Sequence, residues 1–190
     1  MTNIGIVYHS ASGTTAQLAQ AARDGVHQSP GAQAQVYRII GEDIVDGRFV
    51  NSGLLAELAA LDGVIFGSPT YMGGPSAQFK AFADATGELW ANRAWADKLA
   101  AGFTIGSNLS GDQLNTIAYF QTFASQHGML WVSLDVPGGY ESGVPNRLGA
   151  QGGLIAQTRD TRVNEQDLAT ARYLGQRMAT LGAGRMRSAA

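Results

Sequence analysis

Residues 4–15 read IGIVYHSASGTT and combine an apolar run with an abrupt change to small and hydroxyl-bearing residues. A nearly continuous apolar run is typical of a strand that is buried on both faces of a parallel sheet. Apolar residues then recur at helical spacing, at Leu18, Ala22 and Val26. The stretch therefore predicts a buried strand, a tight hydroxyl-rich turn and a helix.

Short apolar runs alternate with amphipathic segments along the rest of the chain, which indicates parallel strands joined by helices. Further strands are predicted at 64–67, 99–106 and 129–132, and an edge strand at 34–40. The predicted helices carry stripes at Phe79, Phe82, Ala83 and Thr86, at Leu114, Ile117, either Phe120 or Gln121, and Ala124, and at Leu168, Ala171, Leu174, Met178 and Leu181. Pro75 is predicted in the first turn of the first of these helices and Asn164 as the N-cap of the last. We therefore predict an α/β fold, a doubly wound five-stranded parallel sheet with helices on both faces.

The composition fits one globular domain. The chain has 190 residues, of which 45% are hydrophobic and 15% charged, and it contains no Cys. We expect a single domain over residues 1–182 and a flexible C-terminal tail over 183–190. The absence of Cys excludes disulfides, thiolate catalysis, iron–sulfur clusters and thiolate zinc sites.

The charge pattern bears on partners and location. The formal net charge is −2 and the 13 Lys and Arg residues are scattered, so no basic stripe for nucleic acid is present. The N-terminus lacks a signal-peptide pattern, and no apolar run is long enough to span a bilayer. We expect a cytoplasmic protein with no membrane span. The three His are too far apart to predict a metal site, and His9 and His27 are expected on the solvent side.

Two connections are unusually long. Residues 41–53 are interpreted as a surface excursion. Residues 135–163 exceed what a compact domain normally leaves without local structure, and six Gly lie between Gly138 and Gly153. Connections of this length usually carry function, lack order or are held by a partner.

The turn from Ser10 to Thr15 has the chemistry of a phosphate site. Small residues let the backbone approach an anion, amide N–H groups point toward it, and the positive end of a helix dipole faces it. No Lys or Arg occurs between residues 1 and 22, so backbone amides and hydroxyls would have to hold the anion. The patterns of a mononucleotide P-loop and of a dinucleotide fingerprint are both absent. The alternative is that Ser10 and Ser12 only cap the helix.

Two further strand ends have unusual composition. Residues 67–75 contain two Pro and three Gly around the apolar pair Tyr71 and Met72, which either covers the core or lines one wall of a planar ligand. Residues 104–111 mix Gly with hydroxyl and amide groups that could donate to the carbonyl edge of a heterocycle. Doubly wound sheets bind ligands beyond the carboxyl ends of their strands, so the three segments are expected to form one site.

Five stretches carry a resemblance to a known family: HSASGTT at 9–15, GSPTYMGGPSAQFKAFADATGELW at 67–90, FTIGSNLSGDQ at 103–113, SQHGMLWVSLD at 125–135 and, more weakly, EQDLATARYLGQRMA at 165–179. The chain resembles the flavodoxin-like NAD(P)H:quinone oxidoreductases of the Trp-repressor-binding-protein family. The likeness spans most of the chain except 41–53 and the Gly-rich loop. It implies a flavodoxin-like sheet with strand order 2-1-3-4-5 and a homodimer or homotetramer.

The resemblance also implies a noncovalently bound FMN. The implied cofactor-binding residues are Ser10, Ala11, Ser12, Gly13, Thr14 and Thr15 around the phosphate, Pro69, Thr70, Tyr71, Met72 and Gly73 along the ring, and Ile105, Gly106, Ser107, Asn108, Leu109 and Ser110 at the pyrimidine edge. Ser12 is implied to contact the nicotinamide cofactor, and Trp90 to face the flavin of a neighbouring subunit. We expect Tyr140, in the Gly-rich loop, to help complete the substrate site.

Some positions depart from the family pattern. Tyr71-Met72 replaces an arginine–aromatic pair, Gln126-His127 replaces a pair of histidines, and the third loop is one residue longer. These differences affect the expected substrate preference and flavin potential more than flavin binding.

The implied activity is hydride transfer from NADH or NADPH to FMN, followed by two-electron reduction of a quinone. No catalytic side chain is assigned, and His127, Tyr71 and Tyr140 are candidates for supplying protons. A one-electron flavodoxin carrier is the alternative, although such carriers are usually strongly acidic. A flavin-free interaction protein is a third possibility. The choice between NADH and NADPH stays open, with Arg147 as one candidate for a 2′-phosphate contact.

Overall fold

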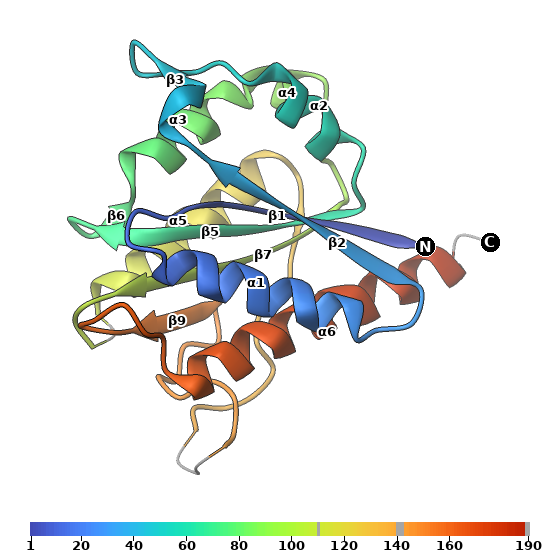
Figure 1. Cartoon of the computed structure of the whole chain (residues 1–190). Coiled ribbons are helices and arrows are strands. Elements are labelled where there is room, and N and C mark those ends of the chain that lie inside the picture. The colour runs from blue at the N-terminus through green and yellow to red at the C-terminus, as the bar shows by residue number, and fades with distance from the viewer. Residues whose placement is uncertain (110, 140–142, 189–190) are drawn as a thin grey trace.

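The computed structural model describes residues 1–109, 111–139 and 143–188. Its central sheet contains four parallel strands, in the order β2 (Ala32–Ile39), β1 (Thr2–His9), β5 (Gly63–Tyr71) and β7 (Leu99–Gly106). Two short strands, β8 (Leu130–Trp131) and β9 (Leu154–Gln157), both pair in parallel with the outer edge of β7. The sheet therefore has the predicted flavodoxin-like order (Figure 1). Its fifth strand is in two pieces.

The division of the fifth strand was not predicted. β8 pairs with Leu99 and Ala100 at the start of β7, whereas β9 pairs with the last four residues of β7. Between them the chain leaves the sheet as a long excursion and returns to the same strand (Figure 1). The predicted strand 129–132 is only the first piece.

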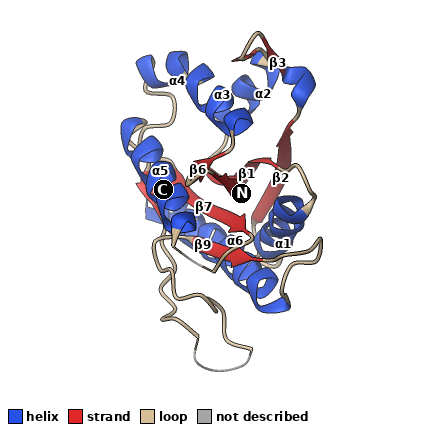
Figure 2. Cartoon of the chain, turned by 90° about the vertical axis from the view of Figure 1, so that its left-hand side faces the viewer, coloured by secondary structure: helices blue, strands red, loops and turns tan. Residues whose placement is uncertain are grey.

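Helices cover both faces of the sheet (Figure 2). One face is covered by α1 (Thr14–His27) and α6 (Glu165–Ser188), over an aliphatic core that includes Ile4, Ile65 and Leu174. The other is covered by α2 (Ser52–Ala59), α3 (Ala77–Ala85), α4 (Gly87–Ala91) and α5 (Asp112–Gln126). Its core is aromatic and contains Phe66, Phe79, Phe82, Trp95, Phe120 and Phe123.

Helices α1 and α6 cross at two glycines that allow backbone contact. A Cβ atom at Gly25 would lie 1.9 Å from the carbonyl oxygen of Arg172, and one at Gly175 would lie 2.0 Å from that of Ala22. Any side chain at either position would force the helices apart.

The predicted surface excursion at 41–53 is a 3₁₀ turn (Gly41–Asp43) followed by the small hairpin of β3 (Ile44–Val45) and β4 (Arg48–Phe49). Helix α2, which was not predicted, follows at once and is capped by the Asn51 side chain, whose Oδ1 accepts from the Leu54 amide at 3.0 Å.

Several helix details differ from the prediction. Pro75 lies in β6 (Gly74–Pro75), and Ser76 rather than Pro75 begins α3, since its Oγ accepts from the Phe79 amide at 3.3 Å. Leu114 and Leu181, which we placed in core stripes, are exposed. Asn164 caps α6 as predicted, because its Oδ1 accepts from the Gln166 amide at 2.9 Å.

The predicted tail is helical as far as the structure describes it. Helix α6 continues to Ser188, and Nη2 of Arg185 donates to the carbonyl oxygen of Asp97 at 3.0 Å. Helix α6 therefore extends to residue 188, beyond the predicted domain boundary at residue 182. Gly182 allows close packing of this helix against β1, because a Cβ there would lie 2.4 Å from Cγ2 of Thr2.

Candidate functional site

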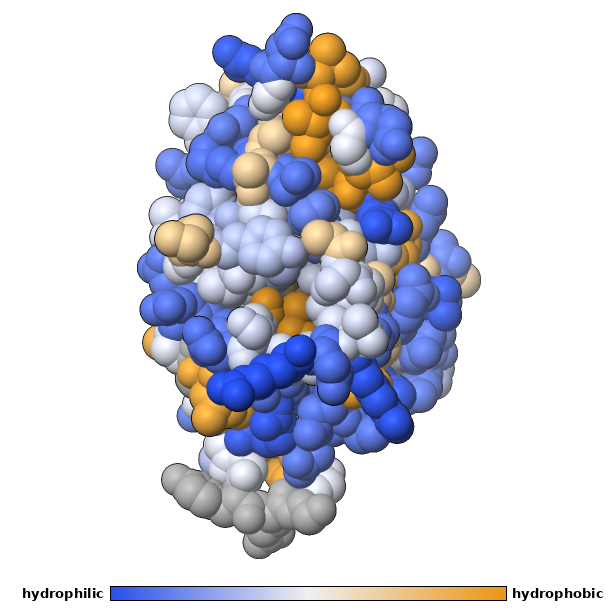
Figure 3. Space-filling model, turned by 60° about the vertical axis from the view of Figure 1, so that its left-hand side comes forward, coloured by the Kyte–Doolittle hydropathy of each residue, from blue (hydrophilic) through white to orange (hydrophobic). Residues whose placement is uncertain are grey.

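The predicted loops meet at the carboxyl ends of β1, β5 and β7, as expected for a doubly wound sheet. There they enclose a cavity of about 260 Å³, lined by Ser12, Thr14, Pro69, Thr70, Tyr71, Ile105, Gly106, Ser107, Thr158, Arg159 and Asp160. A neighbouring hollow of about 490 Å³ is lined by Thr70, Met72, Gly73, Gly106, Ser107, Asn108, Asp112 and Gln113. On this side of the molecule a few hydrophobic atoms are recessed between weakly polar and hydrophilic ones (Figure 3).

The hydroxyl groups of the first loop have two different roles: one binds backbone amides of the loop and helix, and others line the cavity. Ser10 is buried, and its Oγ accepts from the amides of Gly13 at 3.2 Å and Ala16 at 3.3 Å. This is the capping role that we considered as the alternative. Ser12 and Thr14, whose hydroxyl oxygens lie 3.1 Å apart, line the cavity instead. Ser10, Ala11, Gly13 and Thr15 are not among the lining residues.

The second loop is a tight hairpin. Tyr71 pairs with Gly74, and Met72 and Gly73 between them have φ values of 48° and 79°, as a two-residue type I′ turn requires. Tyr71 is half exposed and Met72 fully exposed, and each lines one of the two hollows. The aromatic ring therefore does not cover the core, which favours the interpretation as a ligand wall.

Three threonine hydroxyls form a row of hydrogen bonds beside this hairpin, with Thr70 on β5, Thr104 on β7 and Thr116 on α5. Oγ1 of Thr104 donates to the Ser68 carbonyl at 2.7 Å, so its only hydrogen is used. Oγ1 of Thr70, 2.8 Å away, must then donate to Thr104. Oγ1 of Thr116, 2.7 Å from Thr70, must in turn donate to Thr70. Thr104 and Thr116 are fully buried, so these two hydrogen bonds hold the Thr70 side chain in place at the cavity.

The backbone carbonyl groups of the third loop accept hydrogen bonds from other groups of the protein. The carbonyl oxygens of Gly106, Ser107 and Asn108 accept from the Thr158 amide at 3.0 Å, from Nε2 of Gln157 at 2.9 Å and from Nε2 of Gln113. Within the described part of the chain, the amides of Ser107 and Asn108 have no hydrogen-bond acceptor. The loop therefore presents donors, as predicted for the carbonyl edge of a heterocycle.

The remaining predicted residues of this loop occupy different environments. Ile105 is buried at the end of β7 and lines the smaller cavity, whereas Leu109 is exposed. Ser110 lies outside the described residues.

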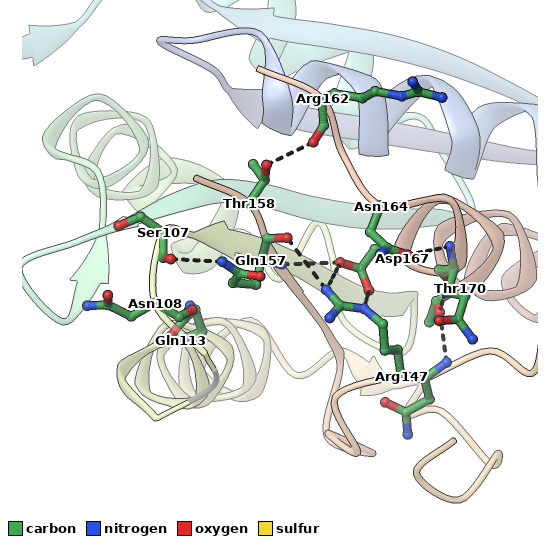
Figure 4. Close-up of polar contacts among 12 residues, drawn as sticks. Ser107, Asn108, Gln113, Arg147, Gln157, Thr158, Arg162, Asn164, Asp167 and Thr170 are labelled. Atoms are coloured by element: carbon green, nitrogen blue, oxygen red, sulfur yellow. Dashed lines mark hydrogen bonds and ion pairs between the residues drawn. The ribbon is translucent and has the colours of Figure 1, made fainter. Parts of the chain in front are cut away.

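A fourth loop, at residues 158–162, was missed by sequence reasoning. It follows β9 and brings Thr158, Arg159 and Asp160 to the cavity. The Thr158 hydroxyl oxygen lies 2.8 Å from the Arg162 carbonyl oxygen (Figure 4), and the Arg162 amide donates to Oδ1 of Asp160 at 2.7 Å. Hydrogen bonds from the Arg162 amide and the Thr158 hydroxyl lower the pKa of Asp160. The signal was hidden because β9 itself was not recognised.

An ion pair ties the long excursion to α6 (Figure 4). The Arg147 guanidinium donates from Nε to Oδ1 of Asp167 at 3.0 Å and from Nη2 to Oδ2 at 2.7 Å. The Gln157 amide donates to the same Oδ2 at 3.2 Å. Arg147 is thus held by Asp167, which contradicts its suggested role as a 2′-phosphate ligand.

Asn146 organises the rest of the excursion. Its amide donates to Oγ1 of Thr170 at 2.7 Å, its Nδ2 donates to the Val136 carbonyl at 2.9 Å, and its Oδ1 accepts from the Ala150 amide at 2.9 Å. The excursion is therefore anchored on α6 at its described residues. Tyr140, our predicted substrate residue, lies outside them.

The histidines lie away from the cavity lining. His27 is exposed as predicted, but His9 is buried, with its pKa lowered by burial and by the charge of Arg38, so that prediction is wrong. His127 is also buried, which lowers its pKa to about 4. Because Thr86 donates its hydroxyl hydrogen to the Ala83 carbonyl at 2.7 Å, His127 Nε2 must be the donor to Thr86, at 2.9 Å. Burial thus favours the uncharged form of the His127 imidazole, which lies in the core.

Trp90 lies in a separate hollow of about 380 Å³ beside α3 and α5, with Tyr119, Gln126 and His127 among its neighbours. Its side chain is 58% exposed. The structure does not bring Trp90 to the strand-end cavity of its own chain.

Within the described ranges, no helix is long and apolar enough to cross a membrane, and no three His, Asp or Glu side chains gather as metal ligands.

The donor set of the cavity fits FMN. The hydroxyls of Ser12 and Thr14 and the amides of Thr14 and Thr15 at the start of α1 suit a phosphate, because these amides have no acceptor within the helix. Tyr71 and Met72 suit the face of a flat ring, and the unpaired amides of the third loop suit its carbonyl edge.

Comparisons with known proteins identify a family and several relatives. The sequence model of the NADPH-dependent FMN reductase family matches residues 2–137. The chain is 35% identical to the flavodoxin FldP of Pseudomonas aeruginosa, over 96% of this chain and 97% of the relative. It is 31% identical to an NAD(P)H dehydrogenase (quinone) of Geobacter sulfurreducens, over 95% and 98% of the two chains.

Among solved structures, the crystal structure of a WrbA-like flavodoxin from Agrobacterium tumefaciens is 39% identical. It superposes with a TM-score of 0.77 over 97% of this chain and 99% of the other. The resemblance found in the sequence, the flavodoxin-like fold and the assignment as a flavin oxidoreductase are confirmed. The family model also agrees with the predicted FMN and nicotinamide donor. The chain belongs to the NADPH-dependent FMN reductase family.

Proposed function

We propose that the protein is an FMN-dependent NAD(P)H:quinone oxidoreductase. When bound, FMN supplies the redox chemistry, since it accepts a hydride from NAD(P)H and gives two electrons to a quinone. The observation that carries the proposal is the convergence of three loops with matching donors. The hydroxyl residues Ser12 and Thr14 line one cavity with Tyr71 and Ser107, and Met72 and Asn108 line the adjoining hollow. The amides of Ser107 and Asn108 have no acceptor in the described part of the chain.

Each loop has one task in this proposal. Ser12 and Thr14 hold the phosphate together with the amides of Thr14 and Thr15. Tyr71 and Met72 position the ring, and the amides of Ser107 and Asn108 donate to its carbonyl edge. The open side of the cavity serves the nicotinamide donor, which contacts Ser12, and then the quinone.

The second half of the substrate site comes from another copy of the chain. Trp90 is 58% exposed and lies away from the cavity of its own chain, which supports the role across a subunit interface that the resemblance implies. A homodimer or homotetramer would bring Trp90 of one copy to the flavin of another. The named function of the Geobacter sulfurreducens relative, an NAD(P)H dehydrogenase (quinone), supports quinone as the acceptor.

The direct test is steady-state turnover of the purified, FMN-loaded protein with NADH or NADPH and a benzoquinone. Oxidation of either nicotinamide that depends on the quinone is expected. No turnover with either donor, in protein that retains FMN, would overturn the proposal.

Subunit complementation tests the shared site. Tyr71→Ser and Trp90→Ala should each lose most quinone reduction, and mixed, re-assembled subunits should recover part of it. Mixing two samples of the same variant is the control. A monomer that stays fully active on dilution would contradict the shared site.

A one-electron carrier is the second candidate, because the Pseudomonas aeruginosa relative is named a flavodoxin. The net charge of −2 argues against it, since carriers use a strong acidic field to find basic partners. A reductive titration separates the two functions. A carrier accumulates protein that has taken up one electron and does not oxidise NAD(P)H, whereas the proposed enzyme takes up electrons in pairs.

A further inference from the structure

The first loop alone is a weak site for a doubly charged phosphate. The Ser10 hydroxyl faces back into the loop, and the amides of Gly13 and Ala16 donate to it. The hydroxyls of Ser12 and Thr14 and the amides of Thr14 and Thr15 remain. These groups are neutral, and no Lys or Arg occurs between residues 1 and 22. A guanidinium would add the attraction of an opposite charge and a bidentate pair of N–H donors, so a cation would matter here.

The fourth loop brings a cation to this place. Arg159 lines the same cavity as Ser12 and Thr14, and it is exposed at the mouth. The loop is fastened to α1, since Nε2 of Gln17 donates to the Thr161 carbonyl at 2.7 Å and Oε1 of Gln17 accepts from the Val163 amide at 3.3 Å. The helix that carries the phosphate loop thus also positions the loop that carries Arg159.

Arg159 makes no ion pair with any residue in the described part of the chain. Its neighbour Asp160 accepts from the Arg162 amide and the Thr158 hydroxyl, which stabilise that carboxylate within the loop. The Arg162 guanidinium lies 3.7 Å from Glu165. The guanidinium of Arg159 is therefore available to a ligand.

Two other arginines near the site are already used. Arg38, on the edge strand β2, donates from Nη2 to the Ser10 carbonyl at 3.0 Å and is not among the residues lining the cavity. Arg147 is held by Asp167. Arg159 is the arginine that the described structure places in the cavity lining beside the first loop.

We propose that Arg159 is the phosphate-recognising cation of the cofactor site, and that it makes the site select a flavin with a terminal phosphate monoester over riboflavin. The inference rests on the proposed function, because it takes FMN as the ligand. A planar guanidinium binds phosphate oxygens through two parallel N–H groups, which a lone ammonium cannot do.

The test compares two flavins that differ only in the phosphate. Dissociation constants of FMN and riboflavin are measured with apoprotein, by flavin fluorescence, for the wild type, Arg159→Gln and Arg162→Gln. Arg162→Gln is the matched control, because it removes the same charge from the same loop at a side chain that is 83% exposed. Thermal melting verifies that all three proteins are folded.

Arg159→Gln should weaken FMN binding by about 10- to 100-fold, the range for a hydrogen bond to a charged group, and leave riboflavin binding unchanged. Arg162→Gln should change neither. Arg159→Lys should recover part of the lost affinity, since it restores the positive charge but not the paired N–H donors of the guanidinium. The preference of Arg159→Gln for FMN should also depend less on salt.

An unchanged ratio of the FMN and riboflavin constants in Arg159→Gln would overturn the role of Arg159 and leave the proposed function standing. An equal loss for both flavins would overturn it as well, since the effect would not be on the phosphate. A wild-type protein that binds neither flavin would refute the proposed function, and the inference with it.

Discussion

Replacing Arg147 with Met should cost the protein a large part of its stability. The Asp167 carboxylate is 1% exposed, and within the described part of the chain it would keep one hydrogen bond, from the Gln157 amide at 3.2 Å. Removing one partner of a buried ion pair costs about 3–5 kcal/mol, because the other charge stays buried. Arg147 is itself 21% exposed, so water reaches part of the pair and the lower end, about 3 kcal/mol, is expected. This corresponds to a fall in Tm of about 6–12 °C in a chain of this size.

Equilibrium unfolding in urea measures the loss, and a double-mutant cycle assigns it. Arg147→Met combined with Asp167→Leu should cost clearly less than the sum of the two single variants, since the pair then leaves no buried charge. Arg177→Met is the matched control. Its partner Asp135 is 48% exposed, and such pairs are worth about 1 kcal/mol or less.

Two results would refute this reasoning. Arg147→Met could destabilise no more than Arg177→Met, which would show that the Asp167 carboxylate does not depend on the guanidinium. Alternatively, the two single effects could add in the double variant, which would mean that the pair is not coupled.

Three further predictions follow from buried contacts. Thr116→Val removes the hydroxyl that donates to Thr70. The free energy of unfolding in urea should fall by about 1–3 kcal/mol, and FMN binding should weaken. If both stay unchanged, the inferred row of threonine hydrogen bonds is contradicted. Burial lowers the pKa of His127 to about 4 from its ordinary value of 6.5, so folding favours the neutral ring. Stability should therefore be complete above pH 6.5 and fall toward pH 4, with a slope from this residue of at most about 1.4 kcal/mol per pH unit, and His127→Gln should remove that slope. Gly175→Ala places a Cβ 2.0 Å from a backbone oxygen of α1 and should destabilise by at least about 1–3 kcal/mol in thermal melts, whereas Gly184→Ala, where a Cβ meets nothing within 4 Å, should not.

The main strands could be predicted because a strand buried on both faces must be apolar along its length. The predicted strand 99–106 coincides with β7 for this reason. The order of the strands and the meeting of three loops then follow from the resemblance and from the way doubly wound sheets bind ligands.

The second half of the fifth strand could not be found in this way. Leu154–Gln157 has four residues, follows a pair of glycines, and is a strand only because β7 offers it a free edge. Missing β9 also hid the loop that carries Arg159. A contact between segments far apart in the sequence leaves no local periodic signal.

His9 was misplaced for a similar reason. A His at the end of a strand, before a polar turn, is usually reached by solvent. Here β1 is an inner strand with β2 beside it, and the end of β1 is enclosed even though the loop that follows is polar. Burial of this kind depends on the neighbouring strands and not on the residue's own segment.

The chain of threonine hydroxyls beneath the cavity has a fixed polarity. The Ser68 carbonyl can only accept, so every hydrogen in the row points the same way, from Thr116 through Thr70 to Thr104. Thr70 has thus given away its hydrogen and keeps one lone pair. A ligand group with an N–H or O–H can donate a hydrogen bond to Thr70 at this point of the cavity wall. A ligand oxygen without a hydrogen finds no donor there. Selectivity here depends on which partner carries the hydrogen, and it is set by a backbone carbonyl that the ligand does not touch.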